Sequence, residues 1–308
     1  MAAKRFSAFG ETPTIGVGFV TCLGRCMNDN LNIHWFPGHM KKACRVIEAN
    51  LKLIDVVVEI TDARVPESGR NPLLSQLSGN KPVVLLLNKR DYADNNATQA
   101  WLSYYKTQGK TAISCDCRSG AGLAGLYEIL VQTVGTRKYG GSIRVMAAGI
   151  PNSGKSSFLN RMAGGKKAAV GDRPGITRGK QWVRVNGKSG SFEILDLPGI
   201  LPPKFDDKQV ALNLAYTGAV RDEVMDTYTL ASSLAEIMTA NHADKLTARY
   251  KITPSSGDTG SVILEGIANS RGMMISGGKP DVERAAAALL DEFRSGKLGR
   301  ITLEFPPL

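Results

Sequence analysis

The sequence predicts an α/β fold, in which a mainly parallel sheet carries helices on both faces, followed by an all-α bundle. Short β-branched runs alternate with segments of helical length as far as Gly199, which is typical of a parallel sheet with crossover helices. Beyond Gly199, helical patterns dominate. The 308 residues are enough for about two domains, and 43% hydrophobic with 22% charged residues is an ordinary globular composition.

Six runs are predicted to be strands because they are short, mostly apolar and rich in β-branched residues. They are Leu53–Ile60, Val83–Leu87, Ala112–Ile113, Ile143–Ala148, Gln181–Val185 and Phe192–Leu195. Asn186-Gly187 lies between the last two and predicts a hairpin turn. Helices are expected between the earlier strands, among them Thr98–Gln108 and Leu123–Val134.

The C-terminal third is expected to be a small helical bundle. Residues 281–294 place apolar side chains at i, i+3, i+4, i+7 and i+8, which is one helical stripe. Gln209–Val220 and Glu223–Thr239 are also expected to be helices, and Ile301–Phe305 a short strand. We therefore divide the chain into an extension (1–31), an α/β domain (32–204) and a helical domain (205–308).

The N-terminal extension has three interpretations. We favour an upstream segment that precedes a natural start at Met27. A mitochondrial targeting segment and a native N-terminus are the alternatives, whereas a secretory signal fits poorly because glycines interrupt the apolar stretch.

Charge is distributed unevenly along the chain. The net charge is +11, with +13 in residues 1–203 and −2 in residues 204–308. This excess favours a polyanionic partner. Five cysteines without a Cys-x-x-Cys pair and only three histidines argue against a zinc site or a disulfide framework. No run approaches the roughly 20 apolar residues of a membrane span, so none is expected.

A phosphate-binding loop is predicted at residues 149–156, GIPNSGKS, between a predicted strand and a predicted helix. Glycines let backbone N–H groups surround phosphate oxygens, and the helix adds its positive N-terminal end. Lys155 would neutralise the β- and γ-phosphates, and the Ser156 hydroxyl would bind Mg²⁺. The expected nucleotide contacts in this region are Asn152, Ser153, Gly154, Lys155, Ser156 and Ser157.

A base-reading loop is predicted at residues 88–91, NKRD, directly after the run PVVLLL. The Asp91 carboxylate can accept from both N1–H and the 2-amino group of guanine, whereas adenine offers no such donor pair. Asn88 and Lys89 would brace this loop and cover the ring. A second base loop is expected after the next strand, at Ser114, Cys115, Asp116 and Cys117, although it departs from the usual Ser-Ala-Lys.

Two further segments are expected to sense the γ-phosphate. Asp196 begins the sequence DLPG after a predicted strand and can hold Mg²⁺ through water, while the Gly199 N–H can contact the γ-phosphate. Thr177 lies in a loop before the hairpin, and its hydroxyl is the candidate second protein ligand. The expected Mg²⁺ ligands are therefore Ser156, Thr177 and Asp196.

The motifs occur in an unusual order, because the base-reading loop precedes the phosphate loop. The same sheet can form if the chain is cut elsewhere, so the order indicates a circular permutation. The chain resembles the circularly permuted GTPases, specifically the ribosome biogenesis GTPase A family and its mitochondrial relatives, over residues 32–308. The matching segments are Trp35–Met40, Asp62–Pro66, Arg70–Pro72, Gly171–Thr177 and Leu201–Phe205.

The resemblance implies a circularly permuted P-loop GTPase domain and a C-terminal domain similar to RNA-binding ANTAR modules. It implies hydrolysis of GTP to GDP and phosphate, with Mg²⁺ and K⁺ as cofactors. It also implies binding to the large ribosomal subunit precursor and its rRNA in the GTP state, late in assembly, with release after hydrolysis.

Hydrolysis needs groups other than the usual glutamine, because that position is Ile200. Asn152 resembles the asparagine of potassium-activated GTPases, with a plain turn residue as the alternative. The resemblance suggests that His39 positions or deprotonates water, and the alternative is that it fixes a helix start or contacts RNA. Lys155 completes the expected catalytic set.

Partner and compartment follow from the charge and the resemblance. Basic residues gather near the switch and suit contacts with RNA phosphates: Lys166, Lys167, Arg173, Arg178, Lys180 and Arg184. We expect a monomer without a DNA partner, in the bacterial cytoplasm or the mitochondrial matrix. The rival functions are a GTPase of the small subunit or of another RNA, a nucleotide-gated binding module with negligible catalysis, and an ATPase.

Overall fold

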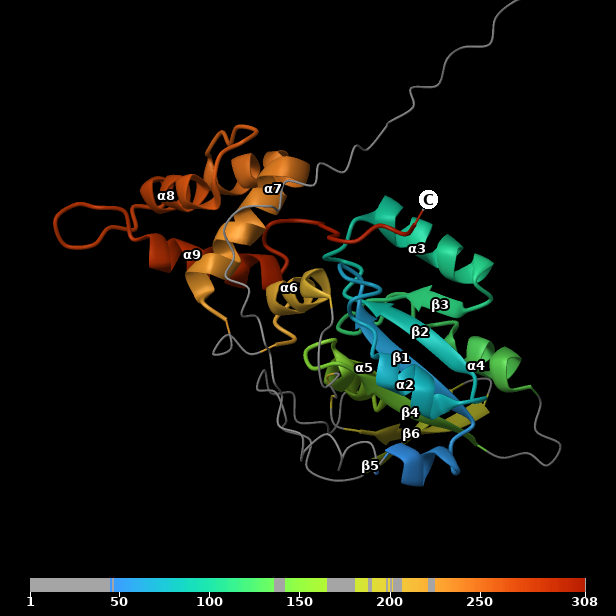
Figure 1. The fold of residues 1–308 in the computed structure, drawn as a ribbon. Helices are drawn as coiled ribbons and strands as arrows, with labels where there is room; N and C mark the ends of the chain where they lie inside the picture. The colour runs from blue at the N-terminus through green and yellow to red at the C-terminus, as the bar shows by residue number, and fades with distance from the viewer. Residues whose placement is uncertain are drawn as a thin grey trace, which may run out of the picture. The chain divides into compact units, whose positions relative to one another are not determined.

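The computed structural model describes residues 45, 47–135, 142–164, 181–187, 190–197, 199, 201, 207–220 and 225–307, all within one compact unit. They form a six-stranded sheet with helices on both faces and a separate group of helices near the C-terminus (Figure 1). This confirms the predicted fold class. The N-terminal extension and the expected boundary at 204/205 lie outside the described residues.

The sheet has the order β3-β2-β1-β4-β6-β5. All neighbouring strands are parallel except β5 and β6. Their bounds are β1 Val56–Asp62, β2 Val83–Asn88, β3 Thr111–Ser114, β4 Ile143–Gly149, β5 Gln181–Gly187 and β6 Gly190–Asp196. The predicted hairpin is confirmed by the antiparallel pairing of β5 and β6, but its turn does not lie at Asn186-Gly187, because both residues belong to the ladder and pair with Ser191 and Gly190.

Alternate side chains of β1 point to opposite faces of the sheet. The whole strand is buried because helices cover both of these faces. Val58 and its i±2 neighbours pack with α4 (Leu126–Val134) and α5 (Lys155–Met162). Val57 belongs to the other face, with Leu74 of α2 (Pro72–Ser78). Beside them, α3 (Asn95–Thr107) packs Trp101 and Tyr105 against β2.

Four helices follow the sheet in the part of the chain that the structure describes: α6 Lys208–Tyr216, α7 Thr227–Tyr250, α8 Gly260–Ser270 and α9 Val282–Arg294. The last three pack on one another, and the predicted stripe of α9 is buried. The predicted end of α7 at Thr239 is wrong, because Leu246 and Tyr250 are also buried and the helix continues to reach them, with a kink at His242. None of the described helices is long and apolar enough to span a membrane.

The predicted strand at 301–305 is wrong, although its backbone is bonded to other segments. Ile301 N donates to Tyr92 O (2.9 Å) and Leu303 N donates to Arg64 O (2.9 Å). These acceptors lie in two separate loops, so no ladder forms. The end of the chain lies beside α3 (Figure 1). There Trp101 Nε1 donates to Glu304 O (2.9 Å).

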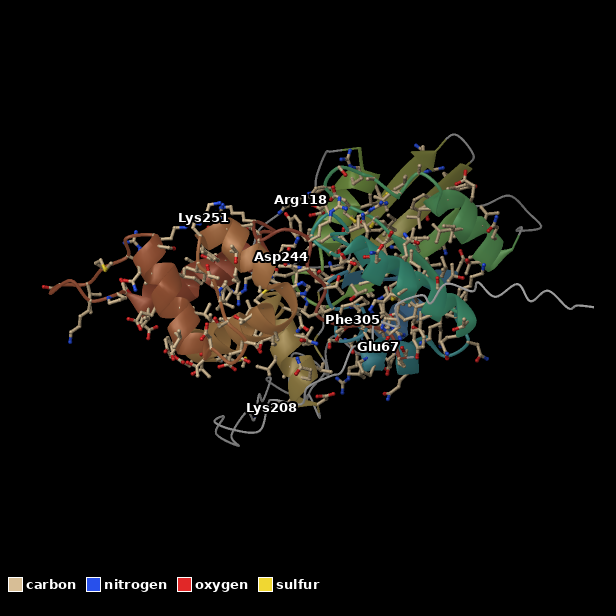
Figure 2. All side chains as sticks on the ribbon, turned by 90° about the horizontal axis from the view of Figure 1, so that it is seen from above. Glu67, Arg118, Lys208, Asp244, Lys251 and Phe305 are labelled. Atoms are coloured by element: carbon tan, nitrogen blue, oxygen red, sulfur yellow. The ribbon has the colours of Figure 1, made fainter. Side chains whose placement is uncertain are left out.

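The carboxylate of Glu304 fixes the same segment. It accepts from the backbone N–H of Glu67 (2.8 Å), from the N–H and hydroxyl of Ser68, and from Asn213 Nδ2 in α6 (3.0 Å). Figure 2 shows the neighbouring Phe305 close to Glu67. The C-terminal segment therefore joins the loop after β1 to α6.

Leu289→Ala should lower the free energy of unfolding by about 2–5 kcal/mol, because Leu289 is fully buried in the stripe of α9 and truncation leaves a cavity. Val262→Ala on α8 is the control, since Val262 is 52% exposed and should change stability by less than about 0.5 kcal/mol. Urea unfolding of both variants checks this. Equal losses would contradict the observed packing of α9.

Candidate functional site

The candidate site lies at one edge of the sheet, where the carboxyl ends of parallel strands meet. The base-reading loop follows β2, the second base loop follows β3 and the phosphate loop follows β4, while Asp196 ends β6. Because β1 lies between β2 and β4, the motifs flank one strand despite their order in sequence. Such an edge is where open α/β sheets bind ligands.

The phosphate loop takes a shape that requires its glycines. Gly154 caps α5 with φ +94°, and a Cβ there would meet Asn88 Nδ2 at 2.0 Å. At Gly149 a Cβ would lie 2.4 Å from the Ile60 carbonyl oxygen of β1. Lys155 is the first residue of α5, and Ser156 and Ser157 are half-buried in its first turn.

A single buried amide joins the three loops. Asn88 Nδ2 donates to the Ser153 carbonyl of the phosphate loop (2.8 Å), and Asn88 Oδ1 accepts from the Cys117 N–H of the second base loop (2.9 Å). Asn88 is 3% exposed. The structure thus brings together the sequence segments from which a guanine nucleotide site was predicted.

Charged groups of the base loops have distinct surroundings. Asp91 is exposed, and partial burial followed by the nearby Asp116 carboxylate raises the pKa of Asp91. The exposed carboxylate is accessible, as suits a group that receives the two donors of guanine. Asp116 instead accepts from Arg118 N (2.8 Å) and Ser119 N (3.1 Å), so it caps its own turn.

Backbone N–H groups of the second base loop donate hydrogen bonds to other groups of the protein. Cys115 N donates to Leu87 O (2.8 Å), Asp116 N donates to Ala121 O (2.9 Å), and the Cys117 N–H is held by Asn88. Both cysteines are buried free thiols. A contact between this loop, which begins at Ser114, and the guanine oxygen therefore stays a prediction.

The predicted phosphate and metal groups lie together. Lys155 Nζ is 2.5 Å from Asp196 Oδ1, and both side chains are buried. The hydroxyl of Ser153 is buried and has no hydrogen-bond partner among the described residues. A buried lysine, a buried carboxylate and an unsatisfied hydroxyl beside a helix N-terminus suit a phosphate group with its hard, oxygen-liganded cation.

The phosphate loop also contacts the region after α6. Asn152 has φ +58°, and its Nδ2 donates to Gly218 O (2.6 Å). Ile150 packs with Leu201, which precedes α6, and with Leu214 of α6. Gly199 also lies against the loop, since a Cβ on it would be 3.1 Å from Pro151 N.

Two predicted site residues, His39 and Thr177, lie outside the described residues, as do Ile200 and five of the six basic residues predicted near the switch. The sixth, Arg184, is exposed in β5. Conversely, the sequence did not predict a role for two buried charged residues beside the base loop, Asp62 and Arg64. Asp62 ends β1 and is 3.0 Å from Lys89 Nζ, and Arg64 pairs with Asp62 at 2.8 Å. A polar or charged residue at the end of an apolar strand, as with Asn88 in β2 and Asp62 in β1, was the available signal.

Comparisons with known proteins agree with this geometry. A family model described as "50S ribosome-binding GTPase" matches residues 144–249. The ribosome biogenesis GTPase A of Priestia megaterium is 40% identical over 285 residues, covering 90% of this chain and 98% of that protein. The mitochondrial ribosome-associated GTPase 1 of Bos taurus is 32% identical, covering 88% of each.

Solved structures give the same assignment. The crystal structure of GNP-bound YlqF from T. maritima superposes with a TM-score of 0.60 at 29% identity, covering 86% of this chain and 98% of that one. The coverage extends over both the sheet and the C-terminal helices, so it includes the permuted order of the motifs. The chain therefore belongs to the ribosome biogenesis GTPase A family and is a GTP-hydrolysing enzyme of ribosome biogenesis.

Proposed function

We propose that this GTPase acts in late assembly of the large ribosomal subunit, binding its precursor and rRNA in the GTP state and leaving after hydrolysis. The description of the matching family model, which names the 50S subunit, supports this choice of partner. The net charge of +13 in residues 1–203 suits contacts with rRNA phosphates. A monomer in the bacterial cytoplasm is the preferred setting, because the bacterial relative is 40% identical and the mitochondrial one 32%.

The observation that carries the nucleotide site is the Asn88 amide, which bridges the phosphate loop and both base loops. In this proposal Asp91 reads N1–H and the 2-amino group of guanine, while Lys89 covers the ring. The loop of Ser114, Cys115, Asp116 and Cys117 closes around the base. Asn152, Ser153, Gly154, Ser157 and Gly199 surround the phosphates.

Lys155 and Asp196 exchange partners in this scheme. Their mutual contact at 2.5 Å holds two opposite charges in the buried site. With nucleotide bound, Lys155 turns to the β- and γ-phosphates, and Asp196, Ser156 and Thr177 hold Mg²⁺. Bound Mg²⁺ neutralises negative charge on the phosphates. Since Ile200 cannot orient water, intrinsic turnover is slow, and His39 together with K⁺ at Asn152 supplies the missing groups on the ribosome.

Gly154→Ala should weaken binding of GDP and GTP at least about tenfold, because its Cβ would displace the Asn88 amide from Ser153. Gly164→Ala is the matched control, since it also has positive φ (+73°) but no described heavy atom within 4 Å of the new Cβ. Titration with fluorescent GDP checks both variants. Equal losses would assign the effect to backbone strain and not to Asn88.

Asp91→Asn should weaken GDP binding roughly 10- to 100-fold, because a hydrogen-bonded charge is replaced by a neutral amide. The variant should gain affinity for xanthosine diphosphate, whose C2 carbonyl can accept from the new amide. Competition against labelled GDP measures both. If ADP competes as well as GDP, and the variant binds like the wild type, Asp91 does not read the base and the ATPase alternative stands.

The partner proposal predicts co-sedimentation with large subunits in the presence of a non-hydrolysable GTP analogue, and release with GDP. Large subunits should also accelerate GTP turnover, more in K⁺ than in Na⁺ if Asn152 ligates K⁺. Small subunits and an unrelated structured RNA serve as controls.

Each rival function has a distinct outcome in this experiment. Preferential binding to small subunits or to the RNA control would overturn the large-subunit proposal. Nucleotide-dependent binding to large subunits without accelerated turnover would favour a nucleotide-gated binding module. Equal turnover in K⁺ and Na⁺ would remove the role of Asn152 in potassium activation.

A further inference from the structure

The segment Asp62–Pro66 has no part in the proposed nucleotide contacts, yet it contains the largest fully buried side chain described. Arg64 is 1% exposed. A buried guanidinium is costly unless its donors are satisfied. Nε and Nη2 bind the Asp62 carboxylate at 3.0 and 2.8 Å, and Nη1 donates to the Phe293 carbonyl at 2.7 Å. This bidentate geometry is specific to arginine.

Asp62 has a second cationic partner in the base-reading loop. Lys89 Nζ lies 3.0 Å from Asp62 Oδ2, and the Lys89 side chain is only 22% exposed. Burial alone would raise the pKa of Asp62, but Arg64 and Lys89 reverse this and hold that pKa well below its usual range. The carboxylate therefore stays ionised between the two cations, and Lys89 is held at the backbone position with φ +59°.

The other end of this network is the last turn of α9. Arg64 places its positive charge beside the Phe293 carbonyl, at the negative end of that helix. The guanidinium also lies 4.8 Å from the Phe293 ring centre and 5.5 Å from that of Tyr92. Tyr92 directly follows Asp91, so one buried side chain contacts both the flank of the base loop and the helical bundle.

We propose that Asp62 and Arg64 are positioning residues for guanine recognition, which hold Lys89 in place and make the geometry of the base loop depend on the C-terminal end of α9. The inference rests on the proposed guanine site. The base is common to GTP and GDP, so the network sets the affinity for both nucleotides. Catalytic turnover at saturating GTP does not depend on it, because the γ-phosphate groups belong to other loops.

Arg64→Lys should raise the KM for GTP and the Kd for GDP at least about tenfold, since lysine cannot bind Asp62 in bidentate fashion and reach Phe293 at once. The kcat should stay within about twofold of wild type. Arg70→Lys is the matched control. It makes the same change in the same loop, where Arg70 pairs with Glu59 (3.4 Å) and Glu67 (3.1 Å), and it should leave KM unchanged.

A second set of variants tests whether Asp62 acts through Lys89. Asp62→Asn and Lys89→Met should each weaken GDP binding, and the double variant should be no weaker than Lys89→Met alone, because both changes remove one interaction. Circular dichroism and thermal unfolding of all variants separate affinity from folding. A mere loss of folded protein would lower the apparent kcat and leave KM unchanged.

Three results would overturn the inference: an unchanged KM in Arg64→Lys, an equal rise in Arg70→Lys, or additive losses in the Asp62 and Lys89 double variant. Failure of the guanine site itself would be distinguishable, because Asp91→Asn would then leave GDP binding intact. If Asp91→Asn weakens GDP binding while Arg64→Lys does not, only the positioning role is wrong.

Discussion

One buried side chain, Asn88, holds the candidate nucleotide site together. A carboxamide can donate and accept at the same time, so Asn88 joins the phosphate loop, 65 residues away, to the second base loop, 29 residues away. Because Asn88 is shielded from water, losing either partner would leave a buried polar group unsatisfied. The same bridge explains why residue 154 has to be glycine, since any Cβ there would occupy the space of the amide.

The order of the motifs along the chain matters little to this site, because the sheet decides where they meet. Parallel strands end at one edge, and β1 lies between the strand that leads to the base loop and the strand that leads to the phosphate loop. A chain cut at a different loop keeps those neighbours. Permutation instead changes which segment is attached after the last motif, and in this chain that segment is α6 with the helical bundle.

The helices beyond the sheet contact both halves of the site. On the phosphate side, Asn152 donates to Gly218 O and Ile150 packs with Leu214. On the base side, Arg64 binds the end of α9, and the Ile301 N–H binds the carbonyl of Tyr92. Displacement of these helices would therefore disturb the phosphate loop and the base loop together.

Sequence alone predicted the six strands of the sheet, the α9 stripe and the phosphate and base loops, because these depend on local periodicity and on short spacings between residues. Only the tertiary structure decided that Asn88 binds Ser153, that Arg64 joins Asp62 to α9, and that residues 301–305 bind two loops and no strand. The partners of such contacts are up to 229 residues apart, as in Arg64 and Phe293. The partner of a buried charge cannot be predicted from sequence periodicity, because it depends on how distant segments pack together.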